Sequence, residues 1–216
     1  MSYITIELND SQMKNIRESL DLRIPLLAAL LVAKKYDDVK SLLNRFRAEN
    51  IPQILLREAI IQTYLFDGYP TALEGLFLMA EVFGGDFTLC EIEVIDDNTI
   101  NKWMTSGKET CRKIYASNYD KLIKNVFSLS PNLANWMLIE GYGKVLSRNG
   151  LNLKYRELIN VAILTIKNYR RQLHSHLKGA LNVKVTKSEI GEVLNLLKPI
   201  SPENVQSALD LLREIA

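Results

Sequence analysis

The chain has 216 residues, 47% of them hydrophobic and 24% charged, a composition that predicts a globular protein with ample apolar material for a core. Its 27 basic and 25 acidic residues give a formal net charge of +2, too balanced to indicate binding to nucleic acid or to an anionic membrane. Two cysteines, Cys90 and Cys111, form neither a CxxC pair nor a disulfide framework, so we expect a reduced, cytoplasmic protein.

The amino-terminal segment predicts neither secretion nor a membrane anchor. The opening residues, MSYITIELND, have no basic region before an apolar run, so we expect no signal peptide. The longest apolar run, residues 24–33, is about half of what spans a bilayer and contains Pro25. We interpret this run as a buried helix.

Helical periodicity dominates the chain and predicts an all-α fold. Residues 26–50 predict two helices that meet near Tyr36, and residues 55–66 predict a third that ends at the turn DGYP, residues 67–70. The next helix, 71–83, ends at a Gly-Gly pair. Only residues 88–96 alternate as a strand would, and we interpret them as an extended linker.

Helix starts in the second half carry clear capping signals. Ser130 precedes Pro131 at the head of a predicted helix over 130–146, and Ser201 precedes Pro202 in the same way. Thr186 and Glu189 have the spacing of a capping box. We therefore predict helices that begin after each of these residues.

The predicted organisation is two helical halves in one compact domain. Residues 1–85 form the first half, 86–110 a linker with a short extended segment, and 111–216 the second half. A weak internal repeat relates 31–61 to 164–194, aligning Tyr36 with Tyr169 and, after a short gap, Glu58 with Glu189. In this register the first half has Ser41 and Leu43 where the second has histidines.

Those two histidines, His174 and His176, are the only ones in the chain. On a helix they lie ~200° apart, on opposite flanks of an apolar stripe, so they cannot share a metal ion, and we expect no metal site. The stripe consists of Tyr169, Leu173, Leu177 and Ala180. The alternative to any functional role is that both histidines are boundary residues of a surface helix.

Two segments resemble the carboxymuconolactone decarboxylase family, which is related to the alkylhydroperoxidase-D-like proteins. They are 136–164, with the pattern GxVxSRxGL from 143 and REL from 156, and 172–194, with HxxxALN from His176 followed by TxxEIxEVL. Residues 57–73 are similar to the family's closing helix and turn. The resemblance implies an all-helical fold that assembles as a homo-oligomer, such as a trimer or hexamer.

The site residues of the family are only partly present. In the peroxidase branch the spacing of Glu, Cys, Cys and His falls here on Glu157, Tyr169, Gln172 and His176, so both cysteines are missing. Peroxide reduction needs an attacking and a resolving thiol, so thiol peroxidase activity is disfavoured. The decarboxylase branch has a glutamate where this chain has Gln172, so its acid–base pair is incomplete as well.

Two functional hypotheses follow from this pattern. The first is a lyase or proton-transfer enzyme that needs no cofactor and acts on a small carboxylate or lactone. His176 would move the proton, Glu157 would orient it across an antiparallel helical hairpin, and the substrate would be bound by Gln172, Tyr169, Arg148 and Arg156. The second is a non-catalytic or weakly active helical oligomer of the same fold.

Overall fold

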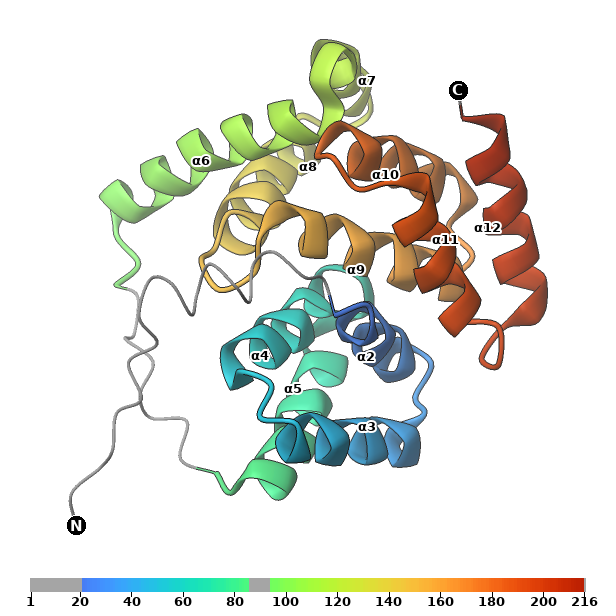
Figure 1. Cartoon of the computed structure of the whole chain (residues 1–216). Helices are drawn as coiled ribbons and strands as arrows, with labels where there is room; N and C mark the ends of the chain where they lie inside the picture. The colour runs from blue at the N-terminus through green and yellow to red at the C-terminus, as the bar shows by residue number, and fades with distance from the viewer. Residues whose placement is uncertain (1–20, 86–93, 216) are drawn as a thin grey trace.

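The computed structural model describes residues 21–85 and 94–215, and all regular structure within these ranges is helical (Figure 1). The helices of the first half are α2 (Arg23–Val32), α3 (Tyr36–Ala48), α4 (Gln53–Gln62) and α5 (Tyr64–Phe83). The second half contains α6 (Asp97–Tyr115), η1 (Ala116–Asn118), α7 (Tyr119–Leu129), α8 (Pro131–Trp136), η2 (Met137–Leu146), α9 (Leu153–Ile166), α10 (Arg170–Asn182), α11 (Lys187–Leu196) and α12 (Pro202–Glu214).

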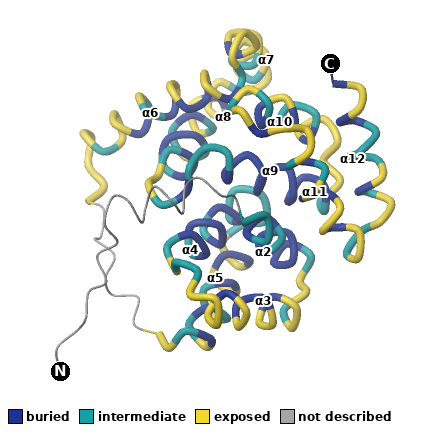
Figure 2. Tube along the Cα trace, in the orientation of Figure 1, coloured by how far each residue is buried: buried dark blue, intermediate teal, exposed yellow. Residues whose placement is uncertain are grey.

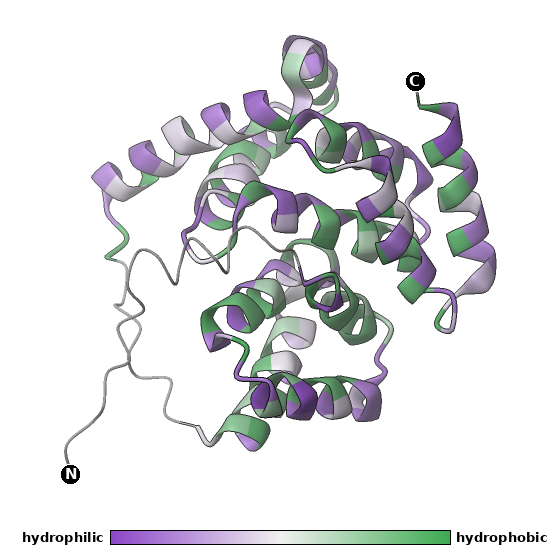
Figure 3. Ribbon diagram, viewed as in Figure 1, coloured by the Kyte–Doolittle hydropathy of each residue, from purple (hydrophilic) through white to green (hydrophobic). Residues whose placement is uncertain are grey.

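Helices α2 and α9 form the centre of the molecule. The run 24–33 is a buried helix, as its composition predicts, and α9 is buried from Tyr155 to Thr165 (Figure 2). Figure 3 shows α2 as largely hydrophobic, whereas α6 carries hydrophilic residues along its exposed side. Because α9 belongs to both main hydrophobic clusters, one with α2–α5 and one with α10–α12, it connects the two halves.

Most predicted helix ends are confirmed. Helix α3 begins at Tyr36, α8 is capped by the Ser130 side chain, and Thr186 and Glu189 form a complete capping box. Ser201 occupies the predicted capping position without a side-chain hydrogen bond. Helix α5 ends at Phe83, followed by Gly84 with φ = 79°, a conformation that favours glycine.

Two predicted boundaries differ from the structure. The helix predicted over 55–66 is interrupted earlier, because α4 ends at Gln62 and α5 begins at Tyr64. The predicted break at DGYP is present, since Gly68 (φ 79°, ψ 174°) is non-helical and separates two helical segments of α5. The predicted linker 86–110 is too long, because α6 begins at Asp97. Residues 88–93 of the predicted extended segment, with Cys90, lie outside the described residues.

Helix η2 has π-helical geometry, which the sequence did not predict, and it packs closely on α6. A Cβ atom added to Gly107 of α6 would lie 2.0 Å from the carbonyl oxygen of Leu138, and one added to Gly143 of η2 would lie 2.1 Å from that of Trp103. The two helices are therefore in backbone contact at a pair of glycines. This crossing fixes the position of Tyr115 and Tyr142, which lie behind the candidate site.

The internal repeat is present in the helix geometry, with a register one residue away from the predicted one. Helix α10 begins 134 residues after α3, α11 begins 134 residues after α4, and the paired helices are equal in length. The turns agree as well: Lys34 and Asn168 have φ of 57° and 54°, and Asn50 and Lys184 have φ of 55° and 70°. In this register the first half has Lys40 and Leu42 where the second has His174 and His176.

Candidate functional site

Glu157 and His176 are in direct contact in the buried interior. Helices α9 and α10 form the predicted antiparallel hairpin, and Nδ1 of His176 lies 2.9 Å from Oε2 of Glu157. Glu157 is fully buried and His176 is 7% exposed. A carboxylate only accepts hydrogen bonds, so Nδ1 carries the proton of this contact, and Nε2 is the nitrogen left to exchange a proton with a ligand.

The Glu157 carboxylate is held by two further features. Asn160, one turn along α9, donates from Nδ2 to Oε1 at 2.9 Å. Gly179, one turn after His176, provides the space, because a Cβ atom there would lie 2.6 Å from Oε2 of Glu157. The carboxylate therefore lies against the backbone of α10, and its orientation toward the imidazole is fixed.

Aromatic rings enclose the imidazole. Phe66 of α5 and Tyr115 of α6 contact His176 edge to face, with ring centroids 6.5 Å and 6.2 Å away. The Tyr142 hydroxyl donates to the Tyr115 hydroxyl at 3.1 Å, and burial raises the pKa of both phenols, so both remain neutral. The imidazole is thus in an apolar setting where hydrogen bonds are electrostatically strong.

The pair is one end of a buried polar chain that joins the two halves. Gln62 of α4 donates to Oδ1 of Asn160 at 2.7 Å and accepts from Nη1 of Arg156 at 3.2 Å. Nη2 of Arg156 donates to Oε2 of Glu58, also on α4, at 2.8 Å. Glu58, Gln62 and Asn160 are at most 1% exposed. None of these three residues was predicted to be part of a site.

A signal for them exists in the sequence. Glu58 and Gln62 stand four residues apart within the apolar helix LLREAIIQ, and Arg156 and Asn160 have the same spacing on α9. Polar residues at this spacing lie on one face of a helix, and a buried polar face requires a polar partner. Two such faces in one sequence indicate a pair, although the pattern does not say that they meet.

The predicted substrate-binding residues lie in different places. Glu58 pairs with both arginines: Arg156 is fully buried, and Arg148 donates to both carboxylate oxygens at 3.0–3.1 Å. Arg156 is therefore committed to the interior. Gln172 is exposed on α10, and Tyr169, the residue just before this helix, is 48% exposed. The prediction that Tyr169 belongs to the buried apolar stripe is therefore wrong. His174 is half-buried on the opposite flank of α10 from His176.

The chemistry that this arrangement supports is proton transfer. Cys111 is fully buried, and burial raises the pKa of its thiol to about 12, so it is not the thiolate that peroxide reduction requires.

Within residues 21–85 and 94–215 no group of three or more His, Cys, Asp or Glu side chains could hold a metal ion. Across the same ranges, no helix is both long and apolar enough to cross a membrane.

Comparison with known proteins agrees with this architecture. The model of the carboxymuconolactone decarboxylase family matches residues 131–214, which include Glu157, Asn160 and His176. Peroxisomal protein 2 of Schizosaccharomyces pombe is 31% identical over 153 residues, covering 68% of this chain and 69% of the relative. Peroxisomal protein 2 of Saccharomyces cerevisiae is 26% identical over 170 residues, covering 67% of this chain and 60% of the relative. The chain belongs to the carboxymuconolactone decarboxylase family.

Proposed function

We propose that the chain is a cofactor-independent proton-transfer enzyme, of the lyase type, that acts on a small carboxylate or lactone. The observation that carries this proposal is the buried Glu157–His176 pair, with Nδ1 held at 2.9 Å and the ring enclosed by Phe66 and Tyr115. Nε2 of His176 is the acid or base, and Glu157 is the positioning residue that fixes the tautomer.

Substrate recognition in this proposal does not use Arg156. Its guanidinium is buried against Glu58, so it is not available to a substrate carboxylate. Arg148 reaches the surface with a side chain that is 40% exposed, although Glu58 holds it as well. Gln172 lies one turn before His176 on the exposed part of α10, so we place it at the entrance, with Tyr169 two turns before His176.

A thermal-shift experiment tests the acid–base role of His176. Small carboxylic acids, keto acids and lactones are screened against the wild type, His176→Gln and His174→Ala. His176→Gln can keep a donor for Glu157, so its own melting temperature should change little. A ligand of the His176 site at 100 times its Kd adds about 2.7 kcal/mol, roughly 5–10 °C for a chain of this size, to the wild type and to His174→Ala but not to His176→Gln.

The outcome separates this proposal from the second hypothesis, a non-catalytic helical oligomer. The buried polar chain favours that alternative, because it gives His176 a structural role in joining α9 and α10. If His176→Gln melts far below the wild type and no compound stabilises either protein, His176 is structural. Turnover of a stabilising compound by the wild type, lost in His176→Gln and Glu157→Gln, would establish the enzyme.

We also propose a homo-oligomer, assembled through α5. Tyr69, Leu73 and Phe77 follow one another at four-residue spacing on this helix and are 50–62% exposed, so they form an apolar stripe. We expect light scattering of the wild type to give a multiple of 24.6 kDa and Leu73→Glu with Phe77→Glu to give smaller species. A wild-type mass of 24.6 kDa at micromolar concentration would contradict this assembly.

For location, we propose the peroxisome in place of the cytoplasm. The support is the name of the two relatives, Peroxisomal protein 2. Expression of a fluorescent fusion together with a peroxisomal matrix marker tests this: the two signals should coincide, and uniform cytoplasmic fluorescence would sink the proposal.

A further inference from the structure

The repeat of 134 residues gives the His176 site a counterpart in the first half. His176 corresponds to Leu42 of α3, and Asn160 corresponds to Leu26 of α2. Around His176, which lies in the second half, Gln62 and Phe66 come from α4 and α5 of the first half. Their counterparts are Leu196, at the end of α11, and Ile200, just after it. Both belong to the second half and face the counterpart position in the first half.

The counterpart position is a cavity. Leu26, Leu42, Leu196 and Ile200 line a space of about 320 Å³ between the first-half hairpin and the end of α11. This volume is at the lower end of the range typical of small-molecule sites. The four residues that correspond to the polar and aromatic groups around His176 thus form an apolar floor, which has no acid–base group.

The rim of this cavity is charged and comes from α3. Lys35 precedes the helix, Asp38 lies in its first turn and Arg45 in its last, so Asp38 and Arg45 are two turns, ~10 Å, apart. Lys35 and Asp38 are three residues apart and carry opposite charges, so they offset each other at one end.

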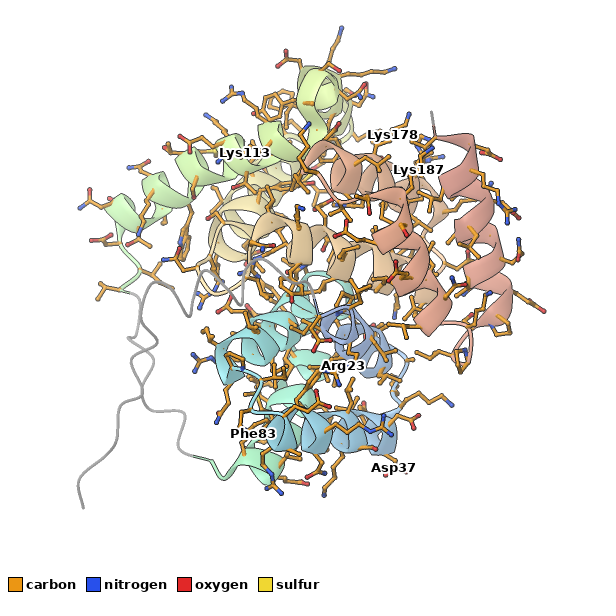
Figure 4. The ribbon with its side chains drawn as sticks, viewed as in Figure 1. Arg23, Asp37, Phe83, Lys113, Lys178 and Lys187 are labelled. Carbon is orange, nitrogen blue, oxygen red and sulfur yellow. The ribbon has the colours of Figure 1, made fainter. Side chains whose placement is uncertain are left out.

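Arg45 provides the net positive charge at the other end. Its neighbour Glu49 is held by two hydrogen bonds from Arg23, at 2.6 Å and 2.9 Å (Arg23 is labelled in Figure 4). Arg45 also acts electrostatically on Glu49, but among the described residues it forms no direct ion pair. Its guanidinium can therefore bind a carboxylate through two parallel hydrogen bonds.

We propose that this cavity is a second ligand site, separate from the His176 site, which binds a small carboxylic acid with an aliphatic chain. The carboxylate pairs with Arg45, and the chain lies on the floor of Leu26, Leu42, Leu196 and Ile200. Because the floor lacks a proton-transfer group, the site binds its ligand without transforming it. The proposal is independent of the catalytic role of His176.

Calorimetric titration of the full chain with hexanoate tests the site, with 1-hexanol as the neutral analogue. The variants are Arg45→Met, which removes the charge, Leu196→Trp, which fills the cavity from a 38% exposed position, and His176→Ala, which leaves this cavity intact. We expect hexanoate to bind the wild type and His176→Ala equally and hexanol to bind more weakly. Arg45→Met should raise Kd about tenfold, as loss of a charge-assisted contact does, and Leu196→Trp should abolish binding.

Several results would overturn the proposal. Binding that survives both Arg45→Met and Leu196→Trp, or that disappears in His176→Ala, would place hexanoate elsewhere. Absence of binding by the wild type at millimolar hexanoate would rule out the ligand class. The remaining alternative is that a second copy of the chain occupies the cavity, which light scattering of the same samples tests. A change in particle mass in Arg45→Met would show that the cavity is a contact between copies.

Discussion

Replacing Glu58 with glutamine should lower the free energy of unfolding by about 3–5 kcal/mol, because it leaves a buried guanidinium without its counter-charge. Arg156 is fully buried, and burial lowers its pKa, which the Glu58 carboxylate opposes. Arg148 depends on the same carboxylate. For a chain of this length, the loss corresponds to a fall in melting temperature of roughly 6–20 °C, measurable by calorimetry.

A matched control is Glu81→Gln. Glu81 also pairs a carboxylate with a cation, Lys40, but both side chains are about half exposed, so water can replace the lost contact. We expect no measurable change in melting temperature. Equal stability of Glu58→Gln and Glu81→Gln would contradict the explanation that the loss comes from the buried charge of Arg156. The double variant Glu58→Met with Arg156→Met removes both charges, so it would contradict the same explanation if it were less stable than Glu58→Gln.

Gly107→Ala should destabilise the protein by about 3 kcal/mol, at the upper end of what overpacking usually costs. The added Cβ would lie 2.0 Å from the carbonyl oxygen of Leu138 and 3.0 Å from the backbone nitrogen of Gly143. A backbone carbonyl cannot rotate away as a side chain does, so α6 and η2 must separate. We expect a melting temperature lower by roughly 6–12 °C.

Gly141→Ala provides the control on the facing helix. No heavy atom lies within 4 Å of an added Cβ at this position, and alanine favours a helix over glycine by up to about 1 kcal/mol. This variant should be as stable as the wild type or slightly more stable. Equal losses in Gly107→Ala and Gly141→Ala would mean that helix geometry, and not the close crossing, makes glycine necessary.

The fold class was predictable from the sequence, because it depends on local signals. The buried apolar run, the start at Tyr36, the caps at Ser130 and Thr186 and the stop at Gly84 all act within one or two turns of the chain. Gly68 and Pro70 predict a break, and Gly68 is indeed non-helical, with Asp67 before it held by Lys167 and Thr71. Prediction failed where the apolar pattern of 55–66 runs on across the end of α4 at Gln62.

The contact within the candidate pair was also predictable, since Glu157 and His176 belong to one hairpin. The residues that surround the pair were not predictable in this way. Arg156 was expected to face a substrate, yet it is held by Glu58, 98 residues away in the chain, and no pattern on α9 alone indicates this partner. The same limit applies to Phe66, which reaches His176 from the other half of the molecule.

That separation has a consequence for biosynthesis. At 5–20 residues per second, roughly 5–20 seconds pass between the synthesis of Glu58 and that of Arg156. During this interval the final partners of Glu58 and Gln62 on α4 have not been synthesised. Burying this face of α4 would leave a carboxylate and an amide without hydrogen-bond partners, which costs free energy. The first half is therefore expected to reach its final packing only after α9 has left the ribosome.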